Sequence, residues 1–193
     1  ETATEPETTT DPEVPPDVDA ETAAAVEEAA RKLPGTTDEI QGITAVALSR
    51  WVKARELGEK ILKQEPDSVS GHFILGAALH HGEGDLPRAL FHLQLAADHG
   101  DDAPPNPVDK NGKSAPTAFP WHGAALMELA SVLGEMERCE EQLRVIDEHD
   151  RRYQQRFPAA RIWPLMKLKR YDEARAAAAA AIATGDPRQR KSA

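Results

Sequence analysis

Histidine is the residue type in this sequence with the most potential for chemistry. Six of the seven histidines lie between residues 72 and 122, and neutral imidazole is a common metal ligand. No HExxH or CxxCH motif accompanies them, and on an α-helix His80 and His81 would point about 100° apart. Two interpretations stay open. The first is that these histidines are solvated or line a groove and bind no metal. The alternative is a metal or cofactor site that uses the His72–His122 histidines, with His80 and His81 as its first candidates.

Other reactive side chains occur without partners at catalytic spacing. The serines stand in no nucleophile motif, and the sequence has no glycine-rich phosphate-binding loop. The single cysteine, Cys139, excludes an internal disulfide and a cysteine-rich zinc site, and it falls in an apolar helical pattern typical of a core position. Residues 109–112 suggest a calcium loop, but Pro107 stands where the first ligand belongs. We therefore expect neither an enzyme nor a cofactor.

Charge is distributed unevenly along the chain. The net charge is −10, yet residues 1–30 contain ten acidic residues and no basic one, whereas residues 151–193 contain 3 acidic and 11 basic residues. The body as a whole has no basic excess, so nucleic acid is not an expected partner. The basic end favours an acidic partner, which we hypothesise to be residues 1–18 or a partner's acidic segment. Its basic residues include Arg151, Arg152, Arg156, Arg161, Lys167, Lys169 and Arg170.

The two ends of the sequence lack the composition of a folded domain. Residues 1–18 are rich in Thr, Pro and Glu, with Val14 and Val18 as the only branched apolar residues, so we expect an acidic, disordered leader. Residues 188–193 form a short basic tail. The first residue is Glu1 rather than Met, which favours an exported chain, periplasmic or extracellular, over a cytoplasmic one. No apolar run approaches the roughly eighteen residues that a membrane span needs.

Helical periodicity fills the part between these ends. Apolar residues recur at helical spacing in a short segment from Asp19 to Leu33 and then in four pairs of segments, with breaks near residues 49–50, 81–85, 134–135 and 169–170. No segment alternates with the period of a strand. Residues 100–120 contain five prolines and interrupt the pairs as an inserted loop. The sequence predicts one all-α domain over residues 19–187.

The spacing within the pairs matches a known repeat. Gly42, Trp51, Ala54, Ile61 and Pro66 fall on the diagnostic positions of a 34-residue unit. The sequence thus resembles the tetratricopeptide repeat family, and its HGEGD turn and AADHGD ending also resemble Sel1-like repeats. The second unit repeats the pattern with one extra residue in the HGEGD turn, and the fourth contains the helix start YDEA at residues 171–174. The resemblance covers residues 36–187, apart from the inserted loop.

This resemblance implies a fold and a function. It implies an α-solenoid of about four helical hairpins, capped by the segment 19–33, with a concave groove that binds a segment of a partner protein. The expected function is a non-enzymatic interaction or scaffold module, an accessory subunit of a larger assembly; an ordinary helical bundle is the alternative architecture. Glu39 and Ile43 replace the Lys and Asn of the family's terminal-carboxylate clamp, so that activity is not expected. The groove residues carried over are Phe73, His80, His81, Trp121, Glu128, Arg156, Trp163 and Lys167.

Overall fold

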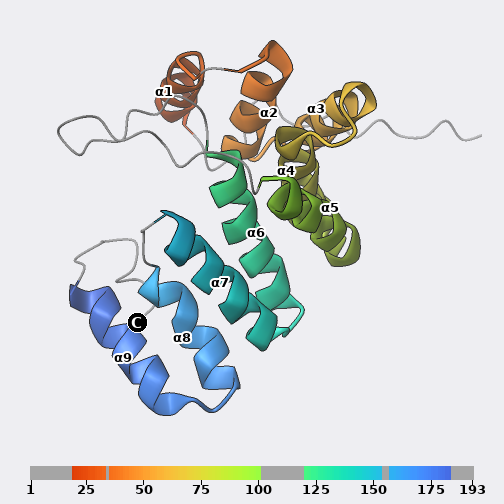
Figure 1. Cartoon of the computed structure of the whole chain (residues 1–193). Coiled ribbons are helices and arrows are strands. Elements are labelled where there is room, and N and C mark those ends of the chain that lie inside the picture. The colour runs from red at the N-terminus through yellow and green to blue at the C-terminus, as the bar shows by residue number, and fades with distance from the viewer. Residues whose placement is uncertain (1–18, 34, 101–119, 154–156, 184–193) are drawn as a thin grey trace, which may run out of the picture.

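The computed structural model describes residues 19–33, 35–100, 120–153 and 157–183, and every regular element in these ranges is helical, as predicted (Figure 1). The predicted leader 1–18, the loop residues 101–119 and the tail 188–193 lie outside the described residues. The α-helices are α1 (Ala20–Ala30), α2 (Thr37–Ala47), α3 (Trp51–Gln64), α4 (Val69–Ala78), α5 (Leu86–His99), α6 (Trp121–Glu135), α7 (Cys139–Tyr153), α8 (Pro158–Lys167) and α9 (Tyr171–Ala183).

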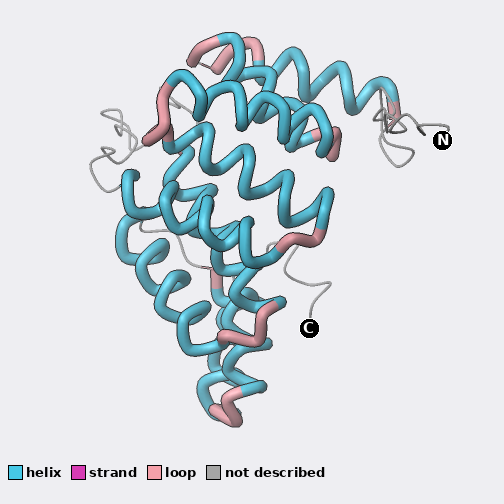
Figure 2. The backbone as a smooth tube through the Cα atoms, turned by 90° about the vertical axis from the view of Figure 1, so that its right-hand side faces the viewer, coloured by secondary structure: helices cyan, strands magenta, loops and turns pink. Residues whose placement is uncertain are grey.

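Successive helices pair as the sequence predicts. The pairs are α2 with α3, α4 with α5, α6 with α7, and α8 with α9, and the second helix of each pair also packs against the first helix of the next. The first helices of the first three pairs also touch one another, because α4 packs against both α2 and α6. Figure 2 shows the helices side by side in successive layers. At the N-terminal end α1 packs against α2, and the N-cap of α1, Asp19, accepts a hydrogen bond from the Thr22 backbone N–H at 2.8 Å.

The same turn joins the two helices of each pair. A residue with positive φ ends the first helix: Ser49 at 56°, Gly84 at 67°, Glu137 at 56° and Lys169 at 60°. In three pairs the next backbone N–H bonds to the carbonyl five residues earlier, as Arg170 does to Leu165 at 2.9 Å. This is the Schellman ending of a helix. The breaks predicted near residues 49–50 and 169–170 are therefore confirmed.

The second pair accommodates its extra residue inside the helix. After α4 the chain continues through a π-helical turn, η1 (Leu79–Glu83), and the Asp85 N–H reaches back six residues to the Leu79 carbonyl at 3.0 Å. Since a π-turn holds one more residue than an α-turn, it absorbs the insertion while leaving the following turn and α5 in place. The extra residue that was predicted in the HGEGD turn is thus taken up by the last, π-helical turn of the first helix, which is wider than an α-helical turn.

Small residues let the helices approach closely where the repeat pattern places them. Ala54 and Ala89 are fully buried. A Cβ added at Gly42 would lie 2.5 Å from the Ile74 Cδ1, and one at Gly76 would lie 2.7 Å from the Leu93 Cγ. Larger residues at these four positions would force the helix axes apart.

The buried apolar side chains form two clusters of unequal size. The larger one extends from Ile43 to Leu133 and surrounds α4, which buries every residue from Ser70 to Ala78. The smaller one consists of Leu143, Leu165, Ala174 and Ala177. Cys139 is buried, as expected. Among the described residues, no helix combines the length and the apolar character needed to cross a bilayer.

Candidate functional site

The structure gathers the predicted groove residues into small groups. His80, His81 and Glu128 lie together, Phe73 lies beside Trp121 with ring centroids 5.9 Å apart, and Trp163 lies beside Lys167. Arg156 lies outside the described residues. Phe73 and His80 are buried, Trp121 and Glu128 are half-buried, and His81, Trp163 and Lys167 are exposed.

His80 joins the second helical pair to the third. It stands on η1, only 2% of its side chain is exposed, and its Nδ1 lies 2.6 Å from the Glu128 Oε1. Its Nε2 lies 2.9 Å from the Glu135 Oε1, so both ring nitrogens bond to carboxylates of α6. Burial lowers the pKa of His80, but the hydrogen bonds to Glu128 and Glu135 outweigh burial and leave this pKa above its ordinary value. The two carboxylates therefore stabilise the protonated form of this ring more than water does for a free histidine.

His81 approaches the same carboxylate from a more open position. Its side chain is 41% exposed, and its Nε2 lies 2.7 Å from the Glu128 Oε1. Its ring stacks on Trp51 of α3, with centroids 5.1 Å apart. The approach of η1 to α3 depends on Gly82, where an added Cβ would lie 2.5 Å from the Trp51 Cβ. Contacts from three helical segments therefore hold His81 in place.

The α-helical template predicted the wrong relation between the two adjacent histidines. Instead of diverging, the rings of His80 and His81 have centroids 4.1 Å apart and both bond to Glu128. The π-helical turn changes the direction of successive side chains, and Glu128, which lies far away in the sequence, offers one oxygen to both rings. Sequence patterns had indicated His80, His81 and Glu128 only as separate candidates. The extra residue in the HGEGD turn was the sign that α-helical geometry would not hold there.

The remaining histidines of the predicted set lie at other places. His72 and His92 form a pair, with Nδ1 atoms 3.0 Å apart, and His99 stands at the edge of this pair. His122 bonds through its Nδ1 to the Tyr153 hydroxyl at 2.7 Å, in a different helical pair. The six histidines therefore do not build one common site among the described residues.

On α8 an exposed aromatic and a cation lie on one face. Trp163 is 44% exposed, and Met166 is also exposed one turn later. The Lys167 Nζ lies 5.1 Å from the centre of the Trp163 ring and 2.6 Å from the Glu137 Oε1. The hydrogen bond from Lys167 lowers the pKa of Glu137. This face can contact an apolar group flanked by polar ones.

Much of the basic charge near the C-terminal end is paired within the chain. Arg151 and Arg152 bond to Glu148, Arg161 bonds to Asp147 and Asp150, and Arg170 bonds to Glu173. Hydrogen bonds from Arg151 and Arg152 lower the pKa of Glu148 to about 2. Paired charges attract an acidic segment less strongly than free ones. This pairing disfavours the predicted docking of an acidic segment on the basic end.

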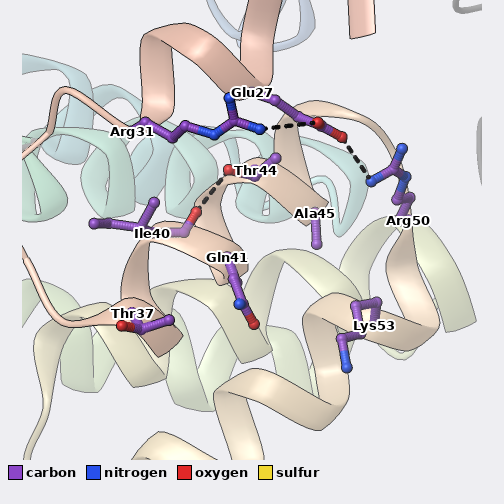
Figure 3. A pocket seen from close by; sticks show the side chains of 9 residues that line it. All are labelled: Glu27, Arg31, Thr37, Ile40, Gln41, Thr44, Ala45, Arg50 and Lys53. Atoms are coloured by element: carbon purple, nitrogen blue, oxygen red, sulfur yellow. Dashed lines mark hydrogen bonds and ion pairs between the residues drawn. The ribbon is translucent and has the colours of Figure 1, made fainter. Parts of the chain in front are cut away.

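A cavity of about 540 Å³ that the sequence did not indicate lies between α1, α2 and the start of α3 (Figure 3). Glu27 lies in it between two cations, 3.9 Å from an Arg31 nitrogen and 3.4 Å from an Arg50 nitrogen. Because three separate segments supply the lining, no local motif marks it. The lining residues are Glu27, Arg31, Thr37, Ile40, Gln41, Thr44, Ala45, Arg50 and Lys53.

Comparisons with known proteins do not assign this chain to a group, since no family model, no curated protein and no solved structure matches it.

Proposed function

We propose that this chain is a non-enzymatic interaction module of the tetratricopeptide-like kind. In this proposal the four helical pairs form a solenoid with α1 as its cap, and a segment of a partner protein lies along the surface formed by α2, α4, α6 and α8. The observation that best supports it is that a residue with left-handed backbone ends the first helix of all four pairs. These residues are Ser49, Gly84, Glu137 and Lys169. The contacts of α4 with α2 and α6 support a shared face.

The side chains on this face suggest what the partner segment contains. Trp163 and Met166 offer exposed apolar area, while Glu135, whose side chain is 57% exposed, offers a carboxylate on α6. Trp is the residue type most often found at the energetic centre of an interface. We therefore place the main anchor of the partner at Trp163 and expect the partner segment to combine an apolar residue with a basic one.

Selection of peptides from a random library against the full chain tests this function. The dissociation constant of a selected peptide is then measured for the wild type and for two alanine variants. Trp163→Ala is expected to weaken binding by about tenfold or more. Phe91→Ala is the matched control, because Phe91 is 58% exposed but stands on α5, the second helix of its pair, and binding should not change.

Two results would contradict the proposal. One is that no peptide is enriched, and the other is that Phe91→Ala weakens binding as much as Trp163→Ala does. Circular dichroism of both variants checks that the helices persist, so that a lost interaction is not confused with a lost fold.

A further inference from the structure

We propose that His80, His81 and Glu128 form a binding site for a divalent first-row transition-metal ion such as Zn²⁺. One donor atom of each residue lies within 4.8 Å of the donors of the other two, and in the described part of the chain these residues form the one group with this geometry. The proposed site overlaps the predicted groove at His80, His81 and Glu128, but its ligand is a metal ion, so it can be tested without a protein partner.

The donor set determines which ions fit. Two imidazoles and one carboxylate match the three-ligand zinc sites that leave a fourth position for water or another ligand. Ca²⁺ and Mg²⁺ prefer oxygen donors, whereas imidazole suits Zn²⁺, Cu²⁺ and Ni²⁺. We therefore expect selectivity for the transition ions.

The surroundings of His80 match those of a metal-bound histidine. Its Nδ1 faces Glu128 on the side of the proposed ion, while its Nε2 is 2.9 Å from the Glu135 Oε1. In metal sites the ring nitrogen that is not bound to the metal commonly donates to a carboxylate, which fixes the ring and makes it a better ligand. Glu135 fills that role here. On the other side, stacking against Trp51 orients the ring of His81.

The change needed to admit an ion is small. The two nitrogens now lie 2.6 and 2.7 Å from the Glu128 Oε1. Tetrahedral coordination at zinc distances sets neighbouring ligand atoms about 3.3 Å apart, so each separation has to lengthen by roughly 0.6 Å. The Glu128 side chain is 20% exposed and that of His81 is 41% exposed, which leaves these two ligands room to move and the ion a path of entry.

The position of the site in the fold adds an independent reason. The two histidines stand on a π-helical turn created by the inserted residue, and such turns are frequent at functional sites. Glu128 comes from α6, so a bound ion would link the second helical pair to the third. We therefore expect the ion to stabilise the junction between them.

Isothermal titration of the full, metal-free chain with Zn²⁺ tests the site. We expect one ion per chain, a higher unfolding temperature in its presence, and no competition from Mg²⁺. His81→Ala and Glu128→Gln should each weaken Zn²⁺ binding by at least tenfold, and Glu135→Gln should weaken it by about tenfold through the orientation of His80. His81→Ala changes the more exposed ring, so the fold should persist, as circular dichroism will verify.

His99→Ala is the matched control, since His99 is also partly exposed and near a carboxylate, Asp67, but stands outside the site. Its Zn²⁺ affinity should equal that of the wild type. The proposal is overturned if the wild type binds no Zn²⁺ at 100-micromolar concentrations or if His81→Ala binds as tightly as the wild type. Equal losses in His81→Ala and His99→Ala also overturn it. None of these readouts involves a protein partner.

Discussion

The pKa values of the histidines in this protein shift in opposite directions according to their neighbours. His80 is buried, but its hydrogen bonds to two carboxylates raise its pKa, whereas His92 faces another histidine. Burial, the nearby His72 and the cation of Arg88 lower the pKa of His92 to about 4. Burial is also the main reason that the pKa of His72 is lowered, even though His72 donates a hydrogen bond to the Pro66 backbone. The His72 and His92 pair is thus built to stay neutral.

This neutrality predicts a loss of stability in acid. Below the ordinary pKa of 6.5 the unfolded chain binds a proton at His92, but the folded chain does so only near pH 4. The free energy of unfolding should therefore fall as the pH drops from about 6.5 to about 4, with about 3 kcal/mol of the loss due to His92. Denaturant unfolding of the wild type and of His92→Gln over this range measures the effect, and the variant should lose less.

The groups around the pair define the control. His72 is contacted by His92 and His99, with the carboxylate of Asp67 nearby, and Arg88 faces His92 from its own helix. His99→Gln removes one of the charges that lower the pKa of His72 but neither member of the pair, so it should change the pH dependence much less than His92→Gln does. An unchanged slope in His92→Gln would show that the pair does not supply the acid sensitivity.

At the scale of the elements, the sequence predicted the helical pairs well because their signals are local. Apolar spacing marks each helix, and the residues at the turns mark each end, as at Ser49 and Lys169. The meeting of His80 and His81 on Glu128 was not predictable in the same way. It depends on a π-helical turn and on a residue 48 positions away in the chain. The cavity beside Arg50 went unpredicted because three helices build it.

The close packing of α3 on α4 leads to a prediction for Gly58. A Cβ added there would lie 2.8 Å from the Leu75 backbone nitrogen and 3.0 Å from its Cα, and backbone atoms cannot rotate away. Ala is favoured over Gly within a helix by about 1 kcal/mol, yet forcing the two helices apart costs more. We expect Gly58→Ala to lower the free energy of unfolding by about 2 kcal/mol.

Denaturant unfolding of Gly58→Ala beside Glu59→Ala separates packing from propensity. Glu59 is the next residue on α3 and is exposed, so its substitution should change stability by less than about 0.5 kcal/mol. A Gly58→Ala variant more stable than the wild type would mean that the helices can separate at no cost, contrary to the tight contact.

At the scale of the whole molecule, stability is shared unequally among the helical pairs. The larger apolar cluster joins residues from α2 to α6, whereas α8 and α9 rest on the small cluster of Leu143, Leu165, Ala174 and Ala177. Contacts run mainly between neighbouring helices, so among the described residues the last pair is held mainly from the side of α7. In such an array, local stability follows the number of buried contacts that each pair makes.

The last pair should therefore open before the rest of the fold, and native-state hydrogen exchange measures this directly. Amides of α8 and α9 are expected to exchange with a smaller opening free energy than those of α3, α4 and α5. Leu165→Ala should reduce protection in α8 and α9 alone. Leu93→Ala removes a fully buried side chain of the larger cluster, and it should reduce protection in the helices of that cluster by about 2 to 5 kcal/mol. Equal protection in all helices, with Leu165→Ala reducing it everywhere, would instead mean that the chain unfolds as one cooperative unit.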